Sequence, residues 1–160
     1  MPRTGKPARA ILAAMLITLT LVASTSSFTP ASASALRSRM LRQINEIRDR
    51  RDVRTLKIDR RLSRKAARHT RAMIRKNSMF HTPNLSGYMA NRSLTPWGEN
   101  LGCGDTVNQV LRRLMRSSAH RRNIVYRKFR KIGLGVVDAG RRRNMCGRRS
   151  VWTTQIFYAR

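Results

Sequence analysis

The sequence contains His81-Thr82, then Gly98-Glu99-Asn100, then Ser-Ser-Ala-His-Arg-Arg-Asn at residues 117–123, and most of its scarce site-forming side chains lie in these three segments. The 160 residues include only three histidines and two glutamates. Two of those histidines and one glutamate lie within or beside segments that we interpret as loops, where binding groups are commonly presented. His81, Glu99 and His120 are therefore the first candidates for a functional site.

Further motifs lie before and after these three segments and extend over most of the chain. An Asn-x-x-Arg pair occurs at residues 45–48, Ile-Gly-Leu-Gly-Val occupies residues 132–136, and Thr-Gln-Ile-Phe occupies residues 154–157. From about Met40 to Tyr158 the chain resembles the CAP superfamily, also called the SCP-like or cysteine-rich secretory protein family, in its compact bacterial form. The resemblance implies an α+β fold, an α-β-α sandwich in which helices flank a small antiparallel sheet.

The residue patterns predict the same classes of element. Apolar residues at helical spacing predict helices over residues 36–47, 60–76 and 107–117. Alternating and β-branched residues predict strands over residues 131–137 and 151–158, joined by a hairpin. The expected order is therefore two helices, a long connection, a third helix and two strands.

The long connection, residues 77–105, is rich in Pro, Asn, Ser and Gly, and we expect a loop there with one short strand. Loops of this length in compact domains are usually functional or disordered. Both of the later helices have start signals: Asp59 is the expected N-cap of the second helix, and Thr106 with Gln109 forms a T-x-x-Q capping box for the third.

Three expectations concern packing. On the first helix one apolar stripe faces the core, and Arg48 with the neighbouring arginines stays in water. Gly133 and Gly135 lie on one face of the expected strand, where a helix or another backbone packs closely. His69 belongs to no motif, so we expect a surface or half-buried helical histidine rather than a ligand.

Residues 1–35 have the layout of a secretory signal peptide. Three basic residues precede an apolar run at residues 10–22, which is shorter than the roughly 20 residues of a membrane-spanning helix. Two Ala-Ser-Ala cleavage patterns follow at residues 31–35. An uncleaved membrane anchor is the alternative. We expect removal of this segment, secretion, and a single domain over residues 36–160.

The chain is strongly cationic, with 35 Lys and Arg against seven Asp and Glu and a formal charge of +28. Residues 1–35 hold three of the basic residues and no acid, which leaves +25 for the remainder. Such a charge attracts cell-wall polymers, acidic lipid headgroups or nucleic acid. Because the basic residues are dispersed, we favour a solvated surface that attracts anionic envelope polymers or lipids over a specific nucleic-acid site.

Cys103 and Cys146 are the only cysteines. In a secreted chain an even pair most simply forms one disulfide, and this one would close a loop of about 44 residues. Metal ligation is the alternative, but the pair lacks C-x-x-C spacing. We therefore favour the disulfide.

The resemblance implies that His81, Glu99 and His120 converge in a central cleft. We expect Asn100 and Asn123, which lie beside the motif residues, to hold loop backbone by local hydrogen bonds. We expect Arg121 either to hold backbone in the same way or to contact an anion in the cleft. The wider family has a second glutamate near the end of the third helix, where this chain has Arg-Ser at residues 116–117.

Several roles for the His81, Glu99 and His120 trio stay open. In one role, the Glu99 carboxylate accepts hydrogen bonds from the histidines and nearby backbone and is purely structural. In the other, the trio binds a small ligand or a divalent metal such as zinc, with a fourth coordination position open. Hydrolysis by a metal-bound water needs a general base. Because the second glutamate of the family is missing here, Glu46 and Asp105 are the candidates for that base.

Ser117 and Ser118 lie close to His120 in sequence, but no third group orients the histidine as a base, so we assign no catalytic residue. The expected function is a secreted binding module that uses the cleft for a small ligand, lipid or divalent metal. The alternatives are a metal-dependent hydrolase acting on a peptide or cell-wall component, and a nonspecific polyanion binder.

Overall fold

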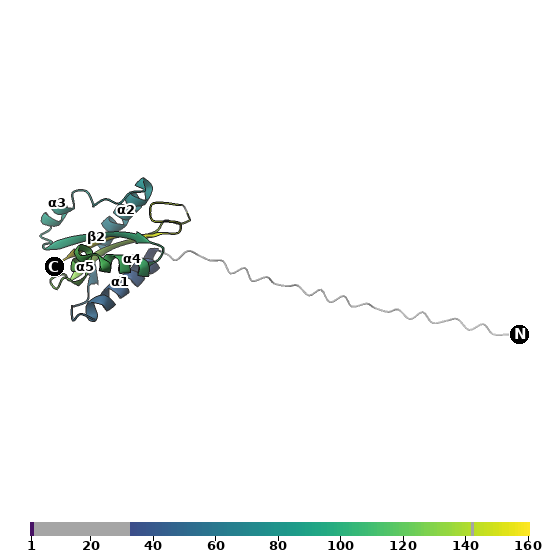
Figure 1. Cartoon of the computed structure of the whole chain (residues 1–160), viewed down its shortest axis with the longest axis horizontal. Helices are drawn as coiled ribbons and strands as arrows, with labels where there is room; N and C mark the ends of the chain where they lie inside the picture. Colours follow the sequence, from purple (N-terminus) through teal and green to yellow (C-terminus); the bar gives the residue numbers. More distant parts are fainter. Residues whose placement is uncertain (2–32, 142) are drawn as a thin grey trace.

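The chain folds into helices packed around a small sheet (Figure 1). The computed structural model describes residue 1, residues 33–141 and residues 143–160. In chain order the elements are α1 (Ala33–Asp49), β1 (Lys57–Ile58), α2 (Arg60–Lys76), α3 (Leu85–Ala90), β2 (Trp97–Gly104), α4 (Val107–Arg116), α5 (Ser118–Val125), β3 (Lys131–Asp138) and β4 (Val151–Tyr158).

The strands form one sheet in the order β1-β3-β4-β2. β4 is antiparallel to both of its neighbours, which confirms the expected antiparallel sheet for the three long strands. The two-residue β1 differs, because it pairs parallel with β3. Backbone bonds fix it there: Lys57 N–H donates to the Arg130 carbonyl at 2.9 Å, and Asp59 N–H donates to the Ile132 carbonyl at 2.8 Å.

Helices cover both faces of the sheet, so the α-β-α sandwich is confirmed. In Figure 1, α2 and α3 lie on one side of β2, and α1, α4 and α5 lie on the other. The close approach expected at the two strand glycines is also confirmed: a Cβ on Gly133 would lie 2.7 Å from the Leu62 carbonyl carbon, and one on Gly135 would lie 2.4 Å from that of Ala66. α2 therefore rests directly on β3.

Apolar side chains fill the space on both faces. Ile44, Leu111 and Phe157 belong to a cluster formed by α1, α4, α5 and the sheet, and Leu62 and Ile156 belong to a second cluster under α2 and α3. All five side chains are buried. Burial of this apolar area is the main free-energy term that stabilises the fold.

The expected helix caps are present. Asp59 Oδ1 accepts a hydrogen bond from Leu62 N–H at 2.8 Å, and Asp59 Oδ2 accepts one from the Tyr158 hydroxyl at 2.7 Å. Burial alone would raise the pKa of Asp59, but these hydrogen bonds outweigh it and the pKa is lowered. At α4, Thr106 Oγ1 accepts from Gln109 N–H at 3.2 Å. The capping box closes differently from the prediction, because Gln109 Oε1 accepts from the N–H of residue 105 at 2.6 Å.

The long connection contains the expected strand, β2, which is eight residues long, whereas the interpretation of residues 85–90 and 118–125 as loops was wrong because both segments are helical. β2 pairs with β4 at all eight of its positions. Its Gly-Glu-Asn-Leu-Gly-Cys-Gly composition has little intrinsic preference for a strand, so pairing and burial stabilise it. α5 follows α4 with only Ser117 between them, and the short α3 lies in the region expected to be a loop. α1 begins at Ala33, ahead of the predicted domain start at residue 36.

The prediction that Arg48 stays in water is also wrong, because its side chain is completely buried. The guanidinium donates to four backbone carbonyls, at 2.8 Å to Arg54, 2.8 Å to Ile124, 3.2 Å to Tyr126 and 3.0 Å to Phe129. Burial and then the nearby charge of another arginine lower its pKa to about 10, so it remains charged at neutral pH. Arg48 ties α1 to the turn between α5 and β3.

The disulfide between Cys103 and Cys146 is confirmed, and it joins the end of β2 to the β3–β4 connection across 43 residues. Apart from residue 1 and the first turn of α1, the predicted signal peptide lies outside the described residues. Among the helices that the structure describes, none has the length and apolar character needed to cross a bilayer.

Candidate functional site

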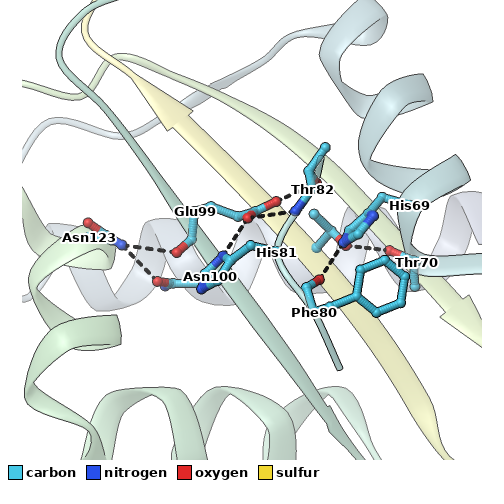
Figure 2. Close-up of polar contacts among 9 residues, drawn as sticks. His69, Thr70, Phe80, His81, Thr82, Glu99, Asn100 and Asn123 are labelled. Atoms are coloured by element: carbon cyan, nitrogen blue, oxygen red, sulfur yellow. Dashed lines mark hydrogen bonds and ion pairs between the residues drawn. The ribbon is translucent and has the colours of Figure 1, made fainter. Parts of the chain in front are cut away.

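The candidate site is built on β2, the edge strand of the sheet. Glu99 projects from this strand, and its side chain is only 3% exposed. Three hydrogen bonds hold its carboxylate: Oε1 accepts from the Thr82 hydroxyl at 2.5 Å, and Oε2 accepts from Thr82 N–H at 3.2 Å and from His81 Nδ1 at 2.6 Å (Figure 2). The His81-Thr82 segment and β2 are thereby joined through a single buried carboxylate.

His81 presents its ring to solvent, since its side chain is 76% exposed. The residue before it, Phe80, is anchored by His69, whose Nε2–H donates to the Phe80 carbonyl at 2.6 Å (Figure 2). His69 is only 6% exposed, so our expectation of a surface or half-buried histidine was wrong. A buried imidazole needs a partner, and the Phe80 carbonyl provides it. His69 therefore fixes the chain that leads to His81.

His120 lies on α5, and its Nδ1 is 2.8 Å from the hydroxyl oxygen of Ser117. Burial, followed by the effect of His81, lowers the pKa of His120. Its imidazole is therefore neutral at neutral pH. Ser117 occupies the region where the wider family has its second glutamate, and here it positions the histidine.

A cluster of amides joins β2 to α5. Asn100 is completely buried. Its Nδ2 donates to the His120 carbonyl at 3.0 Å and to Gln155 Oε1 at 3.3 Å, and its Oδ1 accepts from Asn123 Nδ2 at 2.9 Å. Asn123 also donates to the Glu99 carbonyl at 3.3 Å (Figure 2). These bonds join residues that are 20 to 55 positions apart, so the local loop bonds that we predicted for the two asparagines are instead contacts between elements.

The segments that carry the two histidines approach β2 from opposite faces of the sheet. Successive strand residues point to opposite faces; Glu99 contacts His81, and the next residue, Asn100, contacts α5. His81 and Glu99 line a cavity of about 290 Å³ together with Trp97, and His120 lines a neighbouring cavity of about 280 Å³. Because β2 has no strand beyond it, the two cavities flank an open sheet edge.

The structure does not place the three side chains together as a set of zinc ligands. Both oxygens of Glu99 already accept hydrogen bonds, so Nε2 of His81 and Nε2 of His120 are the ligand atoms that these contacts leave open. In the described parts of the chain, no group of three or more His, Cys, Asp and Glu side chains is placed to hold a metal ion.

The remaining candidates lie outside the cleft. Arg121 is exposed and donates to the Met115 carbonyl at 3.0 Å. It therefore holds backbone, which is one of the two roles that we expected for it. Glu46 is half exposed and lies 3.8 Å from Arg42 on α1. Asp105 is exposed in the turn before α4. Neither acid lines the two cavities at β2.

Sequence reasoning missed the positioning residues Thr82, His69 and Ser117. Thr82 follows His81 directly, so the pair itself was the available signal. The roles of His69 and Ser117 depend on contacts with Phe80 and His120 that no local pattern indicated.

The fold and cleft place the chain among small α-β-α sandwich domains built around a histidine-glutamate pair on an edge strand. More specifically, the chain belongs to the cysteine-rich secretory protein family, because the CAP family model matches residues 41–157.

Among curated proteins, the uncharacterized protein YkwD of Bacillus subtilis is 30% identical over 138 residues, which cover 82% of this chain and 50% of that protein. The chain thus spans about half the length of this relative. Two solved structures are similar in fold. An extracellular protein with an SCP domain from Bacillus anthracis has a TM-score of 0.62 and 23% identity, covering 82% of this chain and 44% of the other. An outer surface protein from Borrelia burgdorferi has a TM-score of 0.63 and 19% identity, covering 77% and 91%.

Proposed function

We propose that the chain is a secreted binding module that holds a small polar ligand at the β2 edge, between His81 and His120. The observation that carries this proposal is the fully engaged carboxylate of Glu99, which accepts three hydrogen bonds within the protein. A glutamate in that state positions His81 and is not available as a general base or metal ligand. Binding, rather than hydrolysis, is the chemistry that this arrangement supports.

The ligand chemistry follows from the two imidazoles. Each uses Nδ1 within the protein, and Nε2 of each has no hydrogen-bond partner among the described residues. Nδ1–H of His81 donates to Glu99, so its Nε2 accepts a hydrogen bond when the ring is neutral and donates one when the ring is protonated. A small molecule with hydroxyl or amide groups, which both donate and accept, is therefore the class of ligand that fits.

Secretion is supported by the signal-like composition of residues 1–35 and by the family relatives, one described as extracellular and one as an outer surface protein. The cationic surface would keep a secreted module near anionic envelope material. This attraction is electrostatic, so we expect retention on anionic vesicles to be lost in 0.5 M salt, a concentration that reduces the Debye length to roughly 4 Å.

The three histidines allow a direct test by NMR. Each gives one Hε1 signal, His81→Ala and His120→Ala assign two of them, and His69 is an internal control because its ring is buried and bonded. We would titrate small polyols, sugars, amides and amino acids into the protein. The expected result is a compound that shifts the signals of His81 and His120 together and leaves that of His69 unchanged.

Two results would refute the proposal. One is a screen in which no compound shifts both signals. The other is turnover of a peptide or cell-wall substrate that requires added Zn²⁺ and disappears in the double variant His81→Ala, His120→Ala, which would establish the hydrolase alternative.

A further inference from the structure

A second cavity lies away from the histidine cleft, at the opposite edge of the sheet. It is a groove of about 710 Å³ between α1 and α2. β1 pairs with only the first two residues of β3, Lys131 and Ile132, so the groove runs beside the part of β3 that lies past this pairing. Its apolar lining includes Leu41, Ile58 and Val136.

Arginines form the rim of this groove. Four of them come from α2 and one from α1: Arg60, Arg64, Arg68, Arg71 and Arg37. The α2 arginines are all exposed and follow one another at intervals of four, four and three residues, so they lie along one face of the helix. The backbone positions of successive arginines are about 6, 6 and 4.5 Å apart along the helix axis, and the row extends for about 16 Å.

The row is not neutralised within the protein. No acidic side chain lines the groove. The ion pairs among the described residues, Arg42 with Glu46 and His81 with Glu99, do not involve it, and α2 itself contains no acid. A linear row of unpaired guanidinium groups beside an apolar strip is complementary to a chain that alternates anionic groups with short aliphatic segments.

We propose that this groove, defined by the five rim arginines, binds a linear phosphodiester polymer of the polyol phosphate type. Each guanidinium of α2 pairs with a successive phosphate, and the CH₂ groups between phosphates contact the apolar lining. A single lipid headgroup offers one phosphate, whereas the row offers four cations in line. No aromatic side chain lines the groove, so it lacks the stacking surface that single-stranded nucleic acid uses.

The test compares two double variants of the full chain that lose the same charge from the same helix. Arg64→Gln with Arg68→Gln removes the centre of the row, and Arg61→Gln with Arg75→Gln removes two exposed arginines of α2 that do not line the groove. Binding of synthetic poly(glycerol phosphate) of defined length is measured by calorimetry at several salt concentrations, and circular dichroism confirms that both variants are folded.

We expect the groove variant to bind about 100-fold more weakly, about tenfold for each lost charged contact, and its salt slope to fall by about 2. The control variant should change affinity by less than about threefold, since it changes only the net charge. Equal losses in the two variants would show nonspecific attraction and overturn the proposal. So would the absence of binding by the unaltered chain, or binding of single-stranded DNA or phosphatidylglycerol vesicles as tight as that of the polymer.

Discussion

Two substitutions of Glu99, by alanine and by glutamine, separate what the hydrogen bonds of its carboxylate contribute to stability from what its charge contributes. In Glu99→Gln the amide oxygen takes the place of Oε2 and still accepts from His81 Nδ1–H and Thr82 N–H. The amide NH₂ takes the place of Oε1 and donates to the Thr82 hydroxyl, which rotates to accept. The glutamine variant therefore keeps the network and loses only the charge.

The expected magnitudes follow from this difference. Loss of the charge costs about 1 kcal/mol, and relief of the desolvation of a buried carboxylate offsets part of it. In Glu99→Ala, the buried N–H of Thr82 loses its partner, at a cost of about 1–3 kcal/mol, and its hydroxyl loses roughly 1 kcal/mol more. We therefore expect the free energy of unfolding to fall by about 3 kcal/mol for alanine and by about 1 kcal/mol or less for glutamine.

Urea denaturation followed by tryptophan fluorescence measures both values, with the disulfide intact. The matched variant Thr82→Val should lose about as much stability as the glutamine variant, because the backbone N–H of residue 82 still donates its hydrogen bond to Glu99. A glutamine variant as unstable as the alanine variant would refute the reasoning, because the charge would then matter more than the bonds. An alanine cost below about 0.5 kcal/mol, typical of a surface site, would show that the carboxylate is not engaged as described.

Gly135→Ala should destabilise the protein by about 3 kcal/mol or more, because its Cβ would lie 2.4 Å from α2 backbone, whereas Gly87→Ala, with no atom within 4 Å, should be close to neutral in the same denaturation assay. The pKa of His120 is lowered by burial and by His81, so its NMR titration midpoint should lie below the ordinary 6.5. Its contribution to stability is then present above about pH 6.5 and lost as the pH falls through the folded pKa; a midpoint at or above 6.5 would contradict this. Cys103→Ser with Cys146→Ser should lower the free energy of unfolding by about 3–4 kcal/mol, the entropy of a loop spanning 43 residues, and an unchanged urea midpoint would contradict it.

Local signals in the sequence predicted most of the helices and strands. Asp59 and Thr106 cap the helices that they were expected to cap, because an N-cap depends on a side chain and a backbone N–H three residues apart. The alternating pattern of residues 131–137 and 151–158 likewise predicted β3 and β4. The family pattern then supplied the order of the layers.

The sequence predicted a short strand in the long connection but not the position or the eight-residue length of β2, because its residues have poor strand propensity and its hydrogen-bond partners belong to β4, more than 45 residues later in the chain. The burial of Arg48 had the same cause. Its acceptors include the carbonyls of Ile124 and Phe129, which come close only after α5 packs against α1. An arginine on an amphipathic helix is normally assigned to water unless such acceptors are known.

The sequence by itself indicated the family, the α-β-α sandwich, the disulfide pair and the three residues His81, Glu99 and His120. It could do so because composition, periodicity and motifs can be read directly from the chain. Only the tertiary structure shows that both oxygens of the Glu99 carboxylate accept hydrogen bonds from His81 and Thr82 and that the segments carrying the two histidines contact opposite faces of an edge strand. Hydrogen-bond saturation and burial depend on residues brought together from distant parts of the chain. They decide whether a glutamate positions a histidine or acts as a base.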